Sequence, residues 1–143
     1  MNQSKYLKYL NRKHEYPDNT CITLITDIYK TELNSNSFDG LWDHLKLPEG
    51  KHFYGSSWIR HISIDSIEKW ASINAKKVDL TAIQEYDVII FKSGRLLPTH
   101  FGMYVGANKF IHLEETKYSR IESLNEKWRS VIASIWRDPG INI

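Results

Sequence analysis

One cysteine and two histidines in this sequence have types and surroundings that suit nucleophilic catalysis. Cys21 opens the apolar segment "CITLITDIYKTEL", and His100 and His112 lie in "PTHFGMYVG" and "KFIHLE". A thiolate is a strong nucleophile, a nearby imidazole can take and return a proton, and a second polar group can fix the tautomer of that imidazole. The three residues therefore predict a nucleophile, a general acid/base and an orienting residue.

Cys21 is expected in the first turn of a helix. Residues 18–20, "DNT", are typical N-cap residues, and three isoleucines recur at helical spacing after them (Ile22, Ile25 and Ile28). The partial positive charge and the unpaired N–H groups at a helix N-terminus both favour a thiolate. The alternative interpretation is that Cys21 is a small buried hydrophobic residue.

The two histidines are expected on the two arms of a β-hairpin. If "GANK" closes this hairpin, His100 and His112 lie near the ends of adjacent strands, where side chains on one face approach within about 5 Å. Alternatively, His100 is a strand-end histidine bonded to a loop carbonyl, and His112 is one polar residue on a strand face. The other four histidines form no HxH or HxxxH pair, so we predict neither a metal site nor a cofactor.

The hydrophobic pattern changes along the chain from a helical to a strand period. "SKYLKYLNR", the Cys21 segment and "SIDSIEKWAS" have helical spacing. The last sixty-odd residues contain five short β-branched and aromatic runs, "YDVIIFK", "THFGMYVG", "NKFIHLE", "YSRIESL" and "SVIASIWR". A helical N-terminal half packed on four or five antiparallel C-terminal strands predicts an α+β fold.

Composition narrows the class of protein further. The 143 residues, 41% of them hydrophobic, suffice for one domain spanning residues 1–143. The net charge is +2, and the densest basic cluster, "NAKKVDL", is interpreted as a solvated loop, so no nucleic-acid partner is predicted. No apolar run is long enough for a membrane span, and the N-terminus has no signal-peptide pattern. We therefore expect synthesis in a cytoplasm.

The residues around Cys21 and the histidines resemble the NlpC/P60 family of papain-like cysteine peptidases. "DNTCITLITDIY", "YDVIIF" and "HFGMYVGANKFIH" are similar to its nucleophile, "GDV" and histidine segments. The tail "YSRIESLNEKWRSVIASIWR" resembles the NlpC/P60 domain of lambda-like phage tail-tip assembly proteins. The pattern there is carried by Ser119, Arg120, Trp128 and Arg137.

The resemblance implies a papain-like NlpC/P60 fold and a role for each site residue. Cys21 matches the nucleophile, His100 the base and His112 the third residue. An upstream tyrosine of the family helps to bind the oxyanion; His14 falls nearest that position, with Tyr16 two residues later. The family's Asp before the nucleophile is Thr20 here, and its "GD" is the Tyr-Asp pair at 86–87.

The implied function is cleavage of peptidoglycan stem peptides, near a D-γ-glutamyl–diamino-acid bond, by a phage tail-tip component carried in the virion. An alternative is a structural protein of the tail tip that contacts other tail-tip proteins and has a weak or inactive site. Four aromatic residues could dock on such a partner (Trp42, Phe53, Tyr54 and Trp58). Acyl transfer by a related fold is a third possibility.

Overall fold

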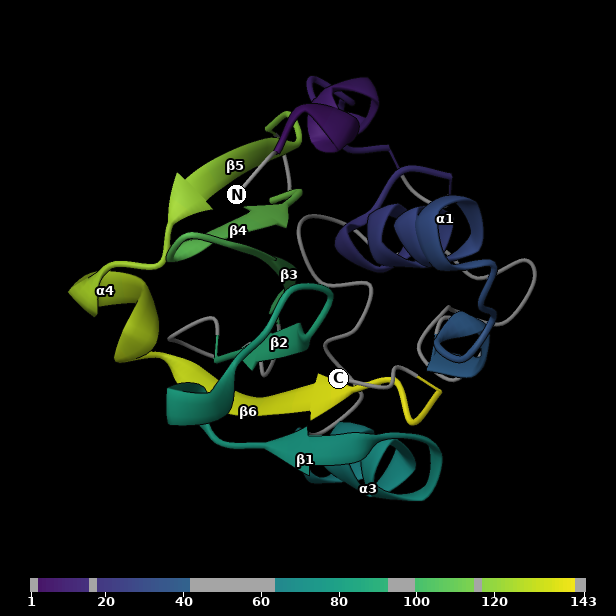
Figure 1. Cartoon of the computed structure of the whole chain (residues 1–143), viewed down its shortest axis with the longest axis vertical. Coiled ribbons are helices and arrows are strands. Elements are labelled where there is room, and N and C mark those ends of the chain that lie inside the picture. The colour runs from purple at the N-terminus through teal and green to yellow at the C-terminus, as the bar shows by residue number, and fades with distance from the viewer. Residues whose placement is uncertain (1–2, 16–17, 42–63, 93–99, 115–116, 141–143) are drawn as a thin grey trace.

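The fold is an antiparallel sheet with a helix packed on one face. The computed structural model describes residues 3–15, 18–41, 64–92, 100–114 and 117–140 (Figure 1). In chain order its elements are the 3-10 helix η1 (Ser4–Tyr9), α1 (Cys21–Leu33), α3 (Ile64–Asn74), β1 (Lys76–Val78), the 3-10 helix η2 (Leu80–Ala82), β2 (Val88–Phe91), β3 (His100–Gly106), β4 (Lys109–His112), β5 (Arg120–Ser123), α4 (Glu126–Arg129) and β6 (Ile132–Arg137). The four aromatic residues considered for docking, Trp42, Phe53, Tyr54 and Trp58, lie outside the described residues.

The six strands form one sheet in the order β1-β6-β2-β3-β4-β5. Strands β2 to β5 are sequential neighbours, whereas β6 returns to lie between β1 and β2. All neighbouring pairs are antiparallel. This architecture confirms the predicted α+β fold, with the longer helices in the N-terminal half. Among the described helices, none is both long and apolar enough to cross a membrane.

Helix α1 begins where its sequence predicts. Thr20 is the N-cap: its hydroxyl accepts a hydrogen bond from the N–H of Thr23 (3.2 Å), and the Thr23 hydroxyl accepts one from the N–H of Thr20 (2.8 Å). At the other end Asn34 adopts the left-handed conformation, with φ 49°. The predicted stripe Ile22, Ile25 and Ile28 is buried. Cys21 is therefore the first residue of α1, as predicted.

The two faces of the sheet carry separate apolar clusters. On β3, Phe101, Met103 and Val105 point toward α1 and share a cluster with its buried residues. Residues alternate between faces along a strand, so His100 points to the opposite face. That face carries a second cluster, which includes Phe91 and Phe110 and against which Trp128 of α4 packs. Helices α1 and α4 accordingly lie on opposite sides of the sheet (Figure 1).

One local prediction needs correction. The basic segment "NAKKVDL" contains strand β1 rather than a loop: it pairs with β6, while Lys76 and Lys77 remain exposed at the sheet edge. The predicted opening helix is present as the short 3-10 helix η1, with Tyr6 and Tyr9 buried. Strand β1 escapes prediction because its three residues include two lysines, which do not favour a strand in isolation.

Candidate active site

The predicted hairpin brings His100 and His112 together. Strands β3 and β4 are joined by Ala107 and Asn108, both with positive φ (53° and 59°), as a tight hairpin turn requires. Gly102 pairs with His112, which places His100 diagonally across on the same face. The Nε2 atom of His100 lies 2.7 Å from Nδ1 of His112. The two imidazoles therefore form a direct hydrogen bond.

The aromatic residues of this face enclose His112 completely. Its ring centroid lies 4.5 Å from that of Phe110 and 5.1 Å from that of Trp128, and the residue has no exposed surface. His100 is partly exposed, with its ring stacked on Phe91 at 5.9 Å. A buried polar ring needs a partner for each nitrogen. The second partner of His112 is Glu122, whose Oε2 lies 2.5 Å from Nε2.

Both histidines are held in the neutral form. Burial is the largest effect on each, and it lowers the pKa of His100 and of His112 well below the ordinary value near 6.5. The proximity of His112 lowers the pKa of His100 further, and the charge of Arg120 does the same for His112. A neutral imidazole keeps one nitrogen lone pair, so one ring nitrogen of His100 is available as an acceptor, although the lowered pKa makes the protonated form unfavourable near neutral pH.

Arg120 supplies positive charge beside the histidine pair. Its Nη2 lies 2.8 Å from Glu122 and also donates a hydrogen bond to Glu114. Burial raises the pKa of Glu114, but the hydrogen bond and the charge of Arg120 act in the opposite direction, and this pKa lies below its ordinary value. Lys117 lies 3.7 Å from the same carboxylate. The carboxylates of Glu114 and Glu122 are thus both paired with the guanidinium of Arg120.

The same residues offer donors that could hold a metal ion. Ligand atoms of His112, Glu114 and Glu122 all lie within 4.8 Å of one another. However, both nitrogens of His112 already have hydrogen-bond partners, and Arg120 bonds to both carboxylates. The donor set therefore fits a charge-paired hydrogen-bond network better than a metal centre.

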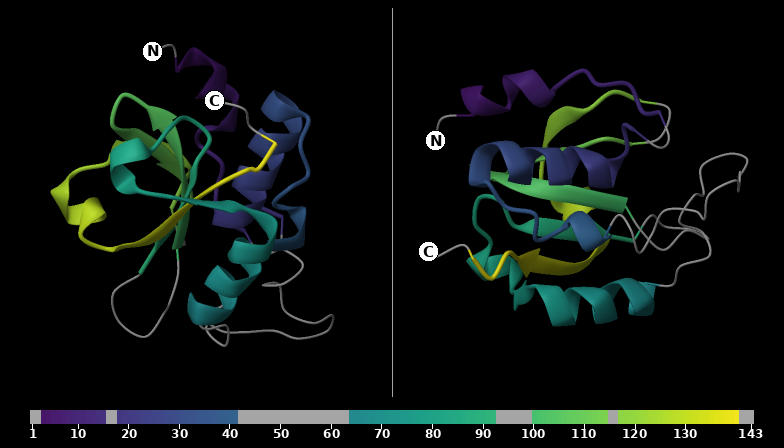
Figure 2. Two further views of the ribbon diagram at one scale, coloured as in Figure 1. Left: turned by 60° about the horizontal axis from the view of Figure 1, so that its bottom comes forward. Right: turned by 90° about the vertical axis from the view of Figure 1, so that its right-hand side faces the viewer.

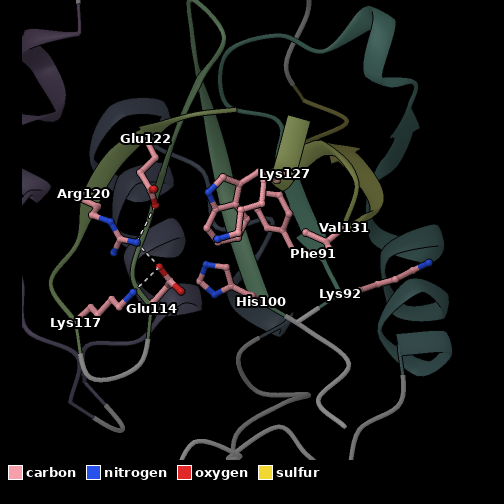
Figure 3. A pocket seen from close by; sticks show the side chains of 10 residues that line it. Phe91, Lys92, His100, Glu114, Lys117, Arg120, Glu122, Lys127 and Val131 are labelled. Carbon is pink, nitrogen blue, oxygen red and sulfur yellow. Dashed lines mark hydrogen bonds and ion pairs between the residues drawn. The ribbon is translucent and has the colours of Figure 1, made fainter. Parts of the chain in front are cut away.

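A pocket of about 360 Å³ opens beside His100 (Figure 3). Glu114 and His100 extend toward each other in this pocket. Its lining is Phe91, Lys92, His100, Glu114, Lys117, Arg120, Glu122, Lys127, Trp128 and Val131. Four of these side chains are cationic and two are anionic, so the pocket presents a net positive surface.

Cys21 lies on the other face of the sheet. It is 5% exposed and belongs to the same cluster as Phe101, the residue after His100. Helix α1 packs against β3, and both elements begin at the same end of the molecule (Figure 2, right). The predicted nucleophile and histidine pair thus lie on opposite sides of β3, with His100 at the first position of that strand.

The predicted oxyanion residues are described only in part. His14 is half-buried, and its backbone N–H donates to the carbonyl of Lys117 (3.0 Å). Burial lowers the pKa of His14. The segment around it runs along residues 117–119, through a bridge between Lys13 and Tyr118. Tyr16 lies outside the described residues.

Sequence reasoning missed the carboxylate neighbours of the histidines. Arg120 and Glu122 are two residues apart on β5, so both project to the face that carries His112. Glu114 follows His112 by two residues at the end of β4. The spacing of Arg120 and Glu122 in the sequence is a signal that the two side chains share a face. It points to His112 only once β5 is known to pair with β4.

The fold is an α+β domain in which a helix that begins with a cysteine packs against an antiparallel sheet that carries a histidine pair. The sequence model of the NlpC/P60 family matches residues 21–137, from the first residue of α1 to the last of β6. The chain belongs to the NlpC/P60 family.

Two comparisons place the chain more closely. It is 26% identical over 130 residues to the tail tip assembly protein K of Escherichia phage lambda, covering 88% of this chain and 57% of that protein. The chain thus spans little more than half the length of that relative. A crystal structure of an NLP/P60-family protein, described as similar to lipoprotein, from Staphylococcus aureus has the same fold. The TM-score is 0.52 at 17% identity, over 94% of this chain and 39% of that one.

Proposed function

We propose that this protein is a cysteine peptidase that cleaves peptidoglycan stem peptides. The observation that carries the proposal is the 2.7 Å hydrogen bond between His100 and His112, in a family member whose single cysteine begins α1. The bond engages Nε2 of His100, so Nδ1 is the atom that would receive a proton. The proposed reaction requires the Cys21 sulfur to approach Nδ1 of His100.

The proposed reaction proceeds through a thioester. The Cys21 sulfur attacks the amide carbonyl while His100 takes the thiol proton, forming a tetrahedral oxyanion. Collapse breaks the C–N bond, and His100 returns the proton to the leaving amine. Water then attacks the thioester with His100 as base, which releases the carboxylic acid and the free thiol. His112 orients His100 throughout.

Oxyanion stabilisation is assigned to the N-terminus of α1 and the segment before it. The backbone N–H of Cys21 would be one donor, and a side chain at His14 or Tyr16 the other. One such donor contributes about 3 kcal/mol to transition-state stabilisation. The helix N-terminus suits this role because the partial positive charge of the helix dipole there stabilises a negative charge.

The direct test is release of muropeptides from purified peptidoglycan. The wild-type protein should release soluble stem-peptide fragments, whereas Cys21→Ala and His100→Ala should not. Cys21→Ser is a matched control, because it preserves the size of the side chain but provides a weaker nucleophile. Equal release by the wild type and Cys21→Ala would remove the catalytic assignment.

We further propose that the protein acts in the virion at the tip of a phage tail, opening the cell wall during entry. The similarity to the lambda tail tip assembly protein supports this location. The same similarity favours a second candidate function, a structural role in tail-tip assembly with other tail proteins. The replacement of the family's Asp and Gly by Thr20 and Tyr86 is compatible with this second role.

Virion assembly separates the two candidates. Phage carrying Cys21→Ala should form normal particles that infect poorly through intact walls if the function is enzymatic. A structural role instead predicts missing tails on deletion of the gene, with normal infectivity of the Cys21→Ala phage.

A further inference from the structure

The imidazole pair continues into a third group on the neighbouring strand. His112 is fully buried, and each of its nitrogens has one partner: His100 at 2.7 Å and Glu122 at 2.5 Å. Glu122 reaches His112 from β5, where it pairs with Phe110 on the same face. The chain of hydrogen bonds therefore runs from the partly exposed His100 through a buried ring to a carboxylate.

We propose that Glu122 is a positioning residue that fixes the tautomers of both histidines, a role that rests on the function proposed above. A carboxylate has acceptor atoms alone. The hydrogen shared with Glu122 must then sit on Nε2 of His112, which leaves Nδ1 of His112 as an acceptor. Nδ1 of His112 can accept this hydrogen bond only if His100 carries its hydrogen on Nε2. Nδ1 of His100 then carries a lone pair.

The opposite tautomer would block the reaction. If Nδ1 of His112 carried its hydrogen, it would donate to Nε2 of His100, and the hydrogen of His100 would move to Nδ1. His100 could then accept no proton from a thiol at that atom. Among the described contacts of His112, only the one with Glu122 selects between the two possible directions of the hydrogen bond between His100 and His112.

Arg120 keeps Glu122 in this acceptor role. Its Nη2 lies 2.8 Å from the same oxygen, Oε2, that faces His112. A guanidinium stabilises the ionised carboxylate, and its charge also opposes protonation of His112. Arg120 also donates a hydrogen bond to Glu114, and this second bond helps to hold the guanidinium in place. The arrangement holds a carboxylate against a neutral imidazole.

The experiment uses Glu122→Gln, which preserves shape while adding an amide donor, and Glu126→Gln on the exposed surface of α4 as the matched control. Long-range ¹⁵N–¹H NMR of the imidazoles reports the tautomers independently of activity. In the wild type and the control, both histidines should carry the hydrogen on Nε2. In Glu122→Gln, a population with the hydrogen on Nδ1 should appear at both.

Kinetics provide the second readout. We expect Glu122→Gln to lower kcat by about 10²-fold, the lower end of the contribution of general acid–base catalysis, with KM little changed. Glu122→Asp should recover part of this loss because it keeps a carboxylate. A wild type with the hydrogen on Nδ1 of His112, or unchanged tautomers in Glu122→Gln, would overturn the inference. Correct tautomers in a protein without hydrolytic activity would overturn the proposed function instead.

Discussion

His100 and His112 have different environments, and these imply different sensitivities to substitution. His100 is partly exposed in the pocket, whereas His112 is buried and contacts His100 through Nδ1. His100→Ala should lower kcat by about 10²- to 10⁴-fold, because it removes the proton acceptor. His112→Gln should cost less, because an amide oxygen can still accept from Nε2 of His100. Steady-state kinetics of both variants, after circular dichroism confirms folding, would check this order; a larger loss in His112→Gln would contradict it.

The lysines beside the pocket should contribute to binding rather than to chemistry. The proposed stem-peptide substrates carry carboxylates, and Lys127 is an exposed cation at the pocket lining. Exposed ion pairs are worth about 0.2–1 kcal/mol, so Lys127→Glu should raise KM by up to about fivefold and leave kcat unchanged. The effect should shrink in high salt. Lys69→Glu, on the exposed side of α3, is the control; equal KM values for both variants would exclude this role.

At the scale of elements, the turn before β2 holds an unusual conformation. Tyr86 has φ 78°, a region that favours glycine, and it occupies the glycine position of the family's "GD". Its N–H donates to the Tyr104 carbonyl (2.9 Å) and its own carbonyl accepts from the Tyr29 hydroxyl. These bonds fix the backbone there. The side chain also contacts Lys5 (2.7 Å).

Two variants at this position isolate the backbone effect. Tyr86→Gly and Tyr86→Ala both lose the ring contacts, but only alanine retains the strain of a positive φ. Tyr86→Gly should therefore be more stable than Tyr86→Ala by about 1 kcal/mol in free energy of unfolding. Urea unfolding of the two proteins measures this difference. If alanine proves equal or better, the positive φ is not a source of strain.

Elements with a local signal could be predicted from the sequence. The cap and isoleucine spacing specify α1, and the "GANK" turn specifies the hairpin that joins His100 to His112. The contact with Glu122 could not be predicted, because it depends on the register of β4 and β5 across residues 113–119. The face on which Cys21 lies likewise depends on how α1 packs against the sheet.

For the whole molecule, the sheet separates the surroundings of the proposed nucleophile from those of the proposed base. One face buries α1 and holds the cysteine at its N-terminus, and the other holds the histidines among Phe91, Phe110 and Trp128. The first residue of β3, His100, belongs to the face that carries the histidines. A nucleophile and a base supported by separate clusters can each be positioned by rigid packing, which favours a preorganised site.

Burial of neutral histidines also makes the stability of the whole molecule depend on pH. In the unfolded chain a histidine binds a proton as the pH falls through about 6.5, whereas the lowered pKa values keep His100 and His112 unprotonated in the folded state. The unfolded state then binds more protons than the folded state. The free energy of unfolding must therefore decrease as the pH is lowered.

We expect that free energy to decrease between pH 6.5 and 5 by at most about 1.4 kcal/mol per pH unit for each buried histidine. Urea unfolding at pH 7.5, 6 and 5 measures this slope, above the range where carboxylates titrate. His100→Gln should show a shallower slope than the wild type, because one of the groups that bind protons on unfolding is gone. His100 is the better site for this substitution since it is partly exposed. A wild-type stability that is constant or rises from pH 7.5 to 5 would contradict this prediction, because it would show that the imidazoles bind protons as readily in the folded protein as in the unfolded chain.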